Sequence, residues 1–189
     1  MNRPLILASS SPRRQELLRA AGVVFEVHPA YIFEERIAGE PPLKYARRLA
    51  QEKTEAVAVE FPDRYVLGAD TIVVAGDEVL EKPVDAGDAA RMLRLLSGRD
   101  HRVITAVSLV APRLAADTQA ATTRVYFREI REEEVQRYIA SGEPMDKAGA
   151  YAIQGGAAQW VQRIEGEYSN VVGLPLTLVK AMLRANGFW

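Results

Sequence analysis

The segment formed by residues 9–14 combines residue types that bind phosphate groups. Ser11 and Pro12 are typical of the first positions of a helix, so Arg13 and Arg14 fall in its first turn. The helix dipole already places partial positive charge there, and two arginines are therefore unfavourable unless an anion binds beside them. A loop of small residues that enters a helix N-terminus can cradle phosphate, and arginine adds bidentate contacts. From this segment alone, a phosphate site and a solvated helix start with surface arginines are equally good interpretations.

Asp70 stands within residues 66–74, a run of mostly apolar residues that is typical of a buried strand. Burial of an unpaired carboxylate costs free energy, so we expect Asp70 to contact a cation, a metal ion or water. A functional carboxylate and a structural carboxylate that caps a neighbouring loop both fit this pattern.

Gln154 lies in a glycine-rich segment, residues 141–156, which has little periodicity. Its amide offers a donor and an acceptor together, which is what the recognition of a nucleotide base edge requires. The small residues around it allow a backbone to approach a ligand closely. A surface loop that binds nothing is the alternative interpretation.

Four other charged residues are candidates only through their surroundings. Lys82 directly follows a predicted hairpin and could lie near Asp70, although a surface turn is the more common role of such a segment. Glu34 and Glu35 lie in a predicted loop, from which either carboxylate could reach a metal ion. Lys53 is expected to be a solvated helix residue.

The elements that must position these residues alternate between strands and helices. In the helix at residues 41–57, we expect Leu43, Ala46, Leu49, Ala50 and Ala56 to face inward. The strands are too irregularly interleaved for a simple doubly wound sheet, so the sequence predicts a mixed α/β fold. The predicted strands comprise residues 5–8, 23–27, 65–75, 78–80, 101–110, 118–127 and 159–164, and the predicted helices comprise residues 12–21, 41–57, 86–96, 131–140 and 174–185.

The composition is close to the average of globular proteins. The 189 residues carry a formal net charge of −1, which argues against generic nucleic-acid binding because that function usually shows a basic excess. No apolar stretch approaches membrane-spanning length, the N-terminus is unlike a signal peptide, and there are no cysteines. We therefore expect a cytoplasmic protein, folded over residues 1–189 as one domain or as two small lobes that share a cleft. His28 and His101 have no partner at metal-ligand spacing, so we expect structural or surface roles for both.

Several segments that extend through almost the whole chain resemble the Maf family of nucleotide pyrophosphatases. Each segment alone would be weak, but their joint occurrence in this order is highly specific. They are residues 7–18, 68–71, 81–83, 92–93, 96–98, 143–151, 153–155 and 171–175, together with His101.

The resemblance implies a single Maf-like domain with an elongated mixed sheet, flanking helices and two lobes around a deep cleft, similar to the inosine triphosphate pyrophosphatases. It also implies a divalent metal ion, magnesium or manganese, and it is compatible with a homodimer. Asp70 would be the general base and a metal ligand, with Glu34 as a second ligand. Family members often have acidic residues just before this glutamate, where this chain has Tyr31 and Phe33, so Glu35 stays an alternative. The implied substrate-binding residues are Ser11, Arg13, Arg14, Lys53, Thr71, Lys82 and Gln154, and Lys147 is a further candidate for phosphate contact.

Within the family, residues 148–151 and 153–155 resemble the branch that hydrolyses dTTP and UTP to the nucleoside monophosphate and pyrophosphate. The branch that acts on 7-methyl-GTP usually has a serine-phenylalanine pair and a glutamate in the corresponding stretch. The resemblance therefore implies a nucleoside triphosphate substrate, with no nucleic acid or membrane as a partner. Three alternatives remain: a 7-methyl-GTP pyrophosphatase, a pyrophosphatase for inosine or xanthosine triphosphate, and a nucleotide-binding regulator of cell division without catalytic activity.

Overall fold

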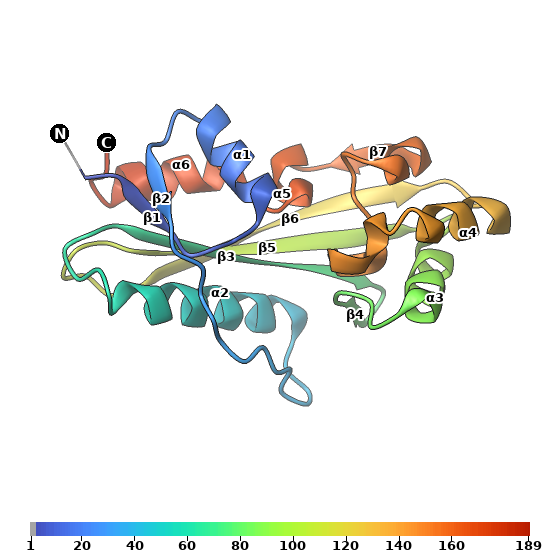
Figure 1. Cartoon of the computed structure of the whole chain (residues 1–189), viewed down its shortest axis with the longest axis horizontal. Helices are drawn as coiled ribbons and strands as arrows, with labels where there is room; N and C mark the ends of the chain where they lie inside the picture. Colours follow the sequence, from blue (N-terminus) through green and yellow to red (C-terminus); the bar gives the residue numbers. More distant parts are fainter. Residues whose placement is uncertain (1–2) are drawn as a thin grey trace. The chain divides into compact units, whose positions relative to one another are not determined.

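The computed structural model describes residues 3–189, in which strands and helices follow one another nearly in the predicted order (Figure 1). Across these residues, no helix combines the length and the apolar character that crossing a membrane requires. The strands are β1 (Leu5–Leu7), β2 (Phe25–Val27), β3 (Val66–Ala75), β4 (Glu78–Leu80), β5 (Asp100–Val110), β6 (Asp117–Phe127) and β7 (Val161–Glu165). The α-helices are α1 (Pro12–Ala20), α2 (Pro42–Ala58), α3 (Ala86–Leu96), α4 (Glu132–Ala140), α5 (Tyr168–Val172) and α6 (Leu176–Ala185), and the 3₁₀ helices are η1 (Glu143–Asp146), η2 (Ala148–Ala150) and η3 (Gly156–Trp160).

The strands form a seven-stranded mixed sheet. The hydrogen-bonded order is β2-β1-β3-β5-β6-β7, and β4 pairs with β3 outside this path. β1 is parallel to both β2 and β3, whereas β4 is antiparallel to β3 and β7 is antiparallel to β6. Gly76 closes the β3–β4 hairpin with a φ of 58°, a left-handed conformation that glycine adopts without strain. The predicted mixed α/β fold is confirmed.

The chain divides into two compact units. Unit 1 comprises Met1–Asp70, Thr105–Ala121 and Gly173–Trp189, and unit 2 comprises Thr71–Ile104 and Thr122–Val172. The strands β3, β5 and β6 each contribute residues to both units. The single domain and the cleft between two lobes stay predictions.

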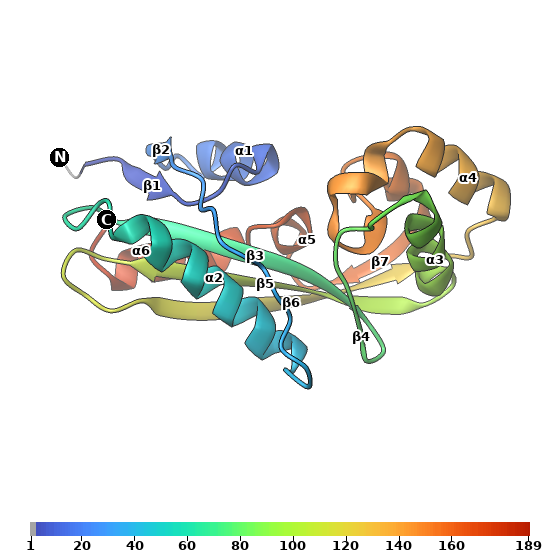
Figure 2. The ribbon, with the colours of Figure 1, turned by 60° about the horizontal axis from the view of Figure 1, so that its bottom comes forward.

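Unit 1 has helices on both faces of its strands, and β1 shows why. Leu5 and Leu7 belong to a buried cluster with residues of α1 and α6, whereas Ile6 packs with Val57 of α2. Successive side chains of a strand point to opposite faces, so a wholly apolar β1 requires cover on both sides. Figures 1 and 2 show α1 and α6 on one face of these strands and α2 on the other.

The predicted inner face of α2 is wrong at both ends. Leu43 is 41% exposed and Ala56 is exposed, whereas the three central residues of the prediction are buried. Thr54 and Val57 are buried near the C-terminal end instead, so the covered stripe is turned towards them. The apolar pattern could not reveal Thr54, because it is a polar residue on the buried face of the helix.

Unit 2 encloses a cluster of aromatic side chains. His101 of β5, which is 1% exposed, contacts the rings of Phe127 and Tyr151 edge-on, at centroid distances of 4.8 and 5.3 Å. Its Nε2 lies 2.7 Å from the hydroxyl oxygen of Tyr151. Trp160 is also buried and contacts both Phe127 and Tyr138. Of the two roles predicted for His101, structural or surface, its burial in this cluster favours the structural one.

Most differences from the prediction lie late in the chain, although β2 also begins two residues later than predicted, at Phe25. Residues 141–156, for which the sequence predicts no regular element, contain η1, η2 and the first residue of η3. The last strand begins at Val161 because the two residues before it complete η3, and α6 begins at Leu176 because Pro175 is its N-cap. Single turns such as α5 are too short to produce the periodicity on which a helix prediction depends.

The burial of His101 predicts a pH dependence of stability. Burial lowers the pKa of His101 from 6.5 to about 4, while the negative charge of Asp100 acts in the opposite direction. Between these two pH values the unfolded chain binds the proton more strongly, so stability is full above about pH 6.5 and falls towards pH 4. The loss should reach roughly 3 kcal/mol.

Urea unfolding at a series of pH values measures this effect. We expect His101→Gln, which keeps a polar partner for Tyr151 but does not titrate, to have a flatter stability profile between pH 6.5 and about 4. Parallel profiles of the variant and the unchanged protein over this interval would show that His101 is not responsible.

Candidate active site

Asp70 is the last residue of unit 1 on β3, and its carboxylate contacts a lysine. The residue is only 6% exposed, and its Oδ1 accepts a hydrogen bond from Lys53 Nζ at 2.7 Å. Lys53 belongs to α2, and its side chain is 13% exposed. Of the three partners that the sequence allows for Asp70, namely a cation, a metal ion or water, the structure shows a cation, Lys53. The prediction that Lys53 is solvated is wrong.

Glu34 contacts the same ammonium group. Its Oε1 lies 3.0 Å from Lys53 Nζ, so two carboxylates share one positive charge. The neighbouring Glu35 is held differently, because its backbone carbonyl accepts a hydrogen bond from Arg48. Of the two glutamates that the sequence leaves open, Glu34 is the one that reaches Asp70's partner.

A glycine in β3 allows α2 to come this close. A Cβ atom on Gly68 would lie 2.2 Å from Oγ1 of Thr54, the residue that follows Lys53. That hydroxyl donates to the carbonyl of Ala50 on α2, and it also lies 3.3 Å from the carbonyl of Ser108 on β5. The close contact between Thr54 and β3 is possible only because residue 68 has no side chain. It therefore determines where α2 packs against β3, two residues before Asp70.

Arg48 anchors the loop that carries Glu34. Its guanidinium forms a fork on the buried carboxylate of Glu40, with Nε–Oε1 at 2.9 Å and Nη2–Oε2 at 2.7 Å, and Nη2 also donates to the carbonyl of Glu35. These hydrogen bonds hold the pKa of Glu40 below its usual value. The loop therefore stays tied to α2 on both sides of residues 36–39.

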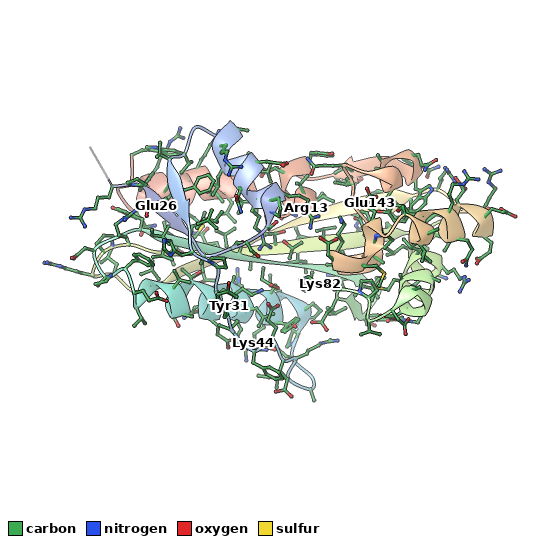
Figure 3. The ribbon with its side chains drawn as sticks, viewed as in Figure 1. Arg13, Glu26, Tyr31, Lys44, Lys82 and Glu143 are labelled. Carbon is green, nitrogen blue, oxygen red and sulfur yellow. The ribbon has the colours of Figure 1, made fainter. Side chains whose placement is uncertain are left out.

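Arg14 lies at the N-terminus of α1 and completes the unit 1 cluster. Ser11 caps the helix, because its side chain accepts from the backbone N–H of Arg14 at 3.5 Å. The guanidinium donates to the carbonyl of Gly173 at 2.8 Å and to Oγ of Ser9 at 3.1 Å. Arg13, which is labelled in Figure 3, lies on the same first turn of α1. The sequence did not reveal that Ser9 and the carbonyl of Gly173 hold Arg14, because these groups come together only in the folded chain.

The charge of Arg14 is coupled to the two carboxylates. Burial lowers the pKa of Arg14, and the nearby positive charge of Arg13 acts in the same direction. The negative charges of Asp70 and Glu34 oppose this shift. Two arginines and two carboxylates thus interact electrostatically near the N-terminus of α1, where backbone N–H groups also favour an anion.

The remaining candidate residues belong to unit 2. Thr71 follows Asp70 on β3 and is half-buried, whereas Lys82 and Gln154 are exposed (Lys82 is labelled in Figure 3). Their part in a common site stays a prediction. The ammonium group of Lys147 is occupied, because it donates to the carbonyl of Glu143 at 2.7 Å and to Asp146 Oδ1 at 2.5 Å.

The carboxylates of Asp70 and Glu34 fit a divalent cation that is bound together with a substrate. Within residues 3–189 no group of three or more histidine or acidic side chains is arranged as a metal cage. Magnesium, however, is usually bound by one or two carboxylates, water and substrate phosphates. Asp70 and Glu34 provide two carboxylates that already share one cation.

The fold has a counterpart among solved structures. The Staphylococcus aureus Ham1 protein aligns with 97% of this chain and 99% of its own, with a TM-score of 0.53 and 13% sequence identity. At this identity the likeness shows the fold alone.

Sequence comparison shows the family. The model of the family described as Maf-like protein matches residues 4–186. A relative from Koribacter versatilis is 56% identical over 97% of this chain and 94% of its own, and one from Citrifermentans bemidjiense is 52% identical over 98% and 97%. Both relatives are named dTTP/UTP pyrophosphatase. The chain belongs to the Maf family.

The anchoring role of Arg48 can be tested by replacing it with methionine. Arg48→Met would leave the buried carboxylate of Glu40 without its fork, and we expect a loss of about 1–3 kcal/mol in the free energy of unfolding. Trypsin should also cleave faster after Arg36, which lies in the loop released from α2. Urea unfolding and timed proteolysis measure the two effects.

Arg47→Met is the matched control, because Arg47 is the exposed neighbour on the same helix. If Arg48→Met and Arg47→Met have the same stability and the same cleavage rate at Arg36, Arg48 does not anchor the loop.

Proposed function

We propose that this chain is a nucleoside triphosphate pyrophosphatase that hydrolyses dTTP and UTP to the monophosphate and pyrophosphate. The single observation that carries the proposal is the contact of Lys53 with both Asp70 and Glu34, beside Arg14 at the start of α1. The activity named for the two relatives, at more than half identity over nearly the full length, supports the choice of reaction and substrate.

Asp70 is proposed as the general base. Hydrolysis between the α- and β-phosphates needs a water molecule in line with the leaving pyrophosphate. The hydrogen bond from Lys53 to Oδ1 orients the carboxylate of Asp70, so that its other oxygen could accept the proton of that water. A general base must be held in position. The buried carboxylate of Asp70, bound by Lys53, is held better than a solvated side chain would be.

The cations of the cluster are proposed to bind the phosphates. Arg13 and Arg14 would contact phosphate oxygens as planar forks, while Lys53 and Lys82 would act as point charges. Ser11 contributes by holding the N-terminal turn of α1, whose backbone N–H groups favour an anion. Phosphate would then add negative charge beside the two arginines at this position.

A divalent ion, magnesium or manganese, is proposed as the cofactor, with Asp70 and Glu34 as its protein ligands. When bound, such an ion polarises phosphate oxygens and lowers the pKa of a coordinated water. Lys53, which contacts both carboxylates, would hold them close to each other.

Gln154 is proposed to read the base, with Thr71 and Arg13 contributing to substrate choice. A uracil or thymine edge offers O4 as acceptor and N3–H as donor, and a glutamine amide can answer both. Guanine presents an acceptor beside two donors, which a carboxylate would meet better. The glutamine therefore favours the pyrimidine nucleotides over 7-methyl-GTP. A cytoplasmic location and a homodimer belong to the same proposal.

A panel of nucleoside triphosphates with pyrophosphate as the readout tests the proposal. We expect pyrophosphate release from UTP and dTTP that depends on magnesium or manganese and exceeds release from 7-methyl-GTP and ITP. Orthophosphate as the main product, or full activity in excess chelator, would contradict the mechanism. Faster hydrolysis of 7-methyl-GTP or ITP would select one of the alternative enzymes, and no turnover would favour a non-catalytic regulator.

A further inference from the structure

The segment that carries Gln154 has no strand or α-helix to hold it. Residues 151–155 connect η2 to η3, and Gln154 itself is exposed. A side chain that recognises a base must nevertheless be held close to its productive position, because small displacements of positioning groups cost large factors in rate. The question is which groups of unit 2 fix this backbone.

Two side-chain hydrogen bonds hold the segment, one on each side of Gln154. The backbone N–H of Ala152 donates to the hydroxyl oxygen of Tyr138 at 2.9 Å. The backbone N–H of Gly156 donates to Oε2 of Glu143 at 3.0 Å. The two held amides are each two residues from Gln154, so they restrain its backbone symmetrically.

The contact between Glu143 and the backbone of Gly156 depends on the glycine at residue 155. A Cβ atom at residue 155 would lie 2.0 Å from Oε1 and 2.5 Å from the carboxyl carbon of Glu143. The φ of Gly155 is −110°, so a left-handed conformation is not the reason for a glycine here. The requirement comes from the close approach of the Glu143 carboxylate.

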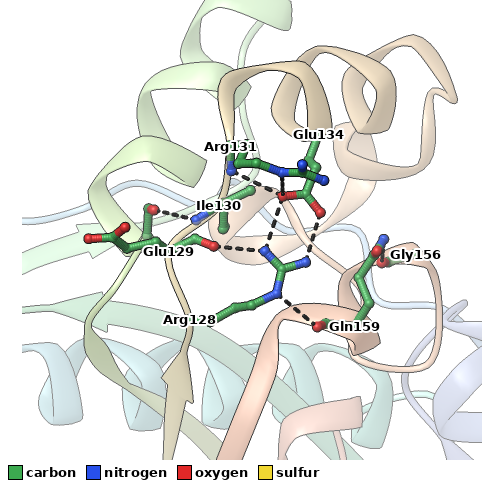
Figure 4. Close-up of polar contacts among 8 residues, drawn as sticks. Arg128, Glu129, Ile130, Arg131, Glu134, Gly156 and Gln159 are labelled. Carbon is green, nitrogen blue, oxygen red and sulfur yellow. Dashed lines mark hydrogen bonds and ion pairs between the residues drawn. The ribbon is translucent and has the colours of Figure 1, made fainter.

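The helix that carries Tyr138, one of the two holding residues, is itself secured by several contacts. Tyr138 is buried on α4, and its ring contacts the buried Trp160 of η3 at 4.9 Å. Figure 4 shows how the start of α4 is secured: the carboxylate of Glu134 accepts from both terminal nitrogens of Arg128 and from the backbone of Arg131. Arg128 Nε also donates to the carbonyl of Gln159, so the same guanidinium ties α4 to η3.

We propose that Tyr138 and Glu143 are positioning residues that present Gln154 to the base of the substrate. The inference rests on the proposed function, since it assumes that Gln154 reads the base. Neither side chain needs to touch substrate: each holds one backbone amide beside Gln154, and together they determine where its amide group lies.

The test separates recognition of the base from hydrolysis of the triphosphate. Steady-state kcat and KM are measured for UTP and for ribose 5-triphosphate, which has the sugar and phosphates but no base. The ratio of the two kcat/KM values reports the contribution of the base. The variants are Tyr138→Phe, Glu143→Ala and Glu143→Gln, with Tyr126→Phe and Glu133→Ala as controls that alter an exposed tyrosine hydroxyl and an exposed glutamate of the same unit.

We expect Tyr138→Phe and Glu143→Ala each to lower the ratio about fivefold, the scale of one lost hydrogen bond, mainly through a higher KM for UTP. Glu143→Gln should recover part of the loss, because its amide oxygen can still accept from Gly156. In a chain that already carries Gln154→Ala, the same changes should have little further effect on the ratio.

The outcomes distinguish two failures. If Gln154→Ala leaves the ratio unchanged, Gln154 does not read the base and the proposed function loses its account of specificity. If Gln154→Ala lowers the ratio but Tyr138→Phe and Glu143→Ala match their controls, or lower both kcat/KM values equally, the positioning role is wrong while the proposed function stands.

Discussion

A carboxylate inside a strand of the central sheet sets the main constraint on unit 1. Asp70 is almost fully buried, and an unpaired charge there would cost several kcal/mol, so a cation must be delivered to it. Lys53 of α2 is that cation, and it can approach because Gly68 leaves room for Thr54 against β3. The same ammonium group then binds Glu34. One packing detail between a helix and a strand thereby assembles the candidate catalytic group.

The cluster brings like charges close together, which is unfavourable when no ligand is bound. Arg13 and Arg14 lie together at a helix N-terminus, and burial lowers the pKa of Arg14. Asp70 and Glu34 compensate only in part, since they are also shared by Lys53. A triphosphate would add negative charge beside the arginines, and a divalent ion would add positive charge beside the carboxylates. The proposed binding of a charged substrate together with a metal ion would use these charges.

Local patterns in the sequence were sufficient for most elements and for the two anomalies that mark the site. The Ser-Pro-Arg-Arg turn and the carboxylate within an apolar strand are visible without a structure because each violates a local rule. Lys53 could not be recognised from its surroundings, since its role depends on where α2 packs. The fork of Arg48 on Glu40 was also invisible, because it joins a helix to a loop across a non-helical spacing. The 3₁₀ turns around Gln154 are too short to have a period.

The central claim is that Asp70 accepts the proton of the attacking water. Turnover of UTP by Asp70→Asn, measured together with its thermal unfolding, tests that claim most directly. Asparagine keeps the size and polarity of the side chain but lacks the charge, so kcat should fall at least roughly 10²-fold while the fold remains intact. Asp77→Asn, at the exposed β3–β4 turn, should change neither quantity. Near-normal turnover of Asp70→Asn would show that the carboxylate has a structural role only.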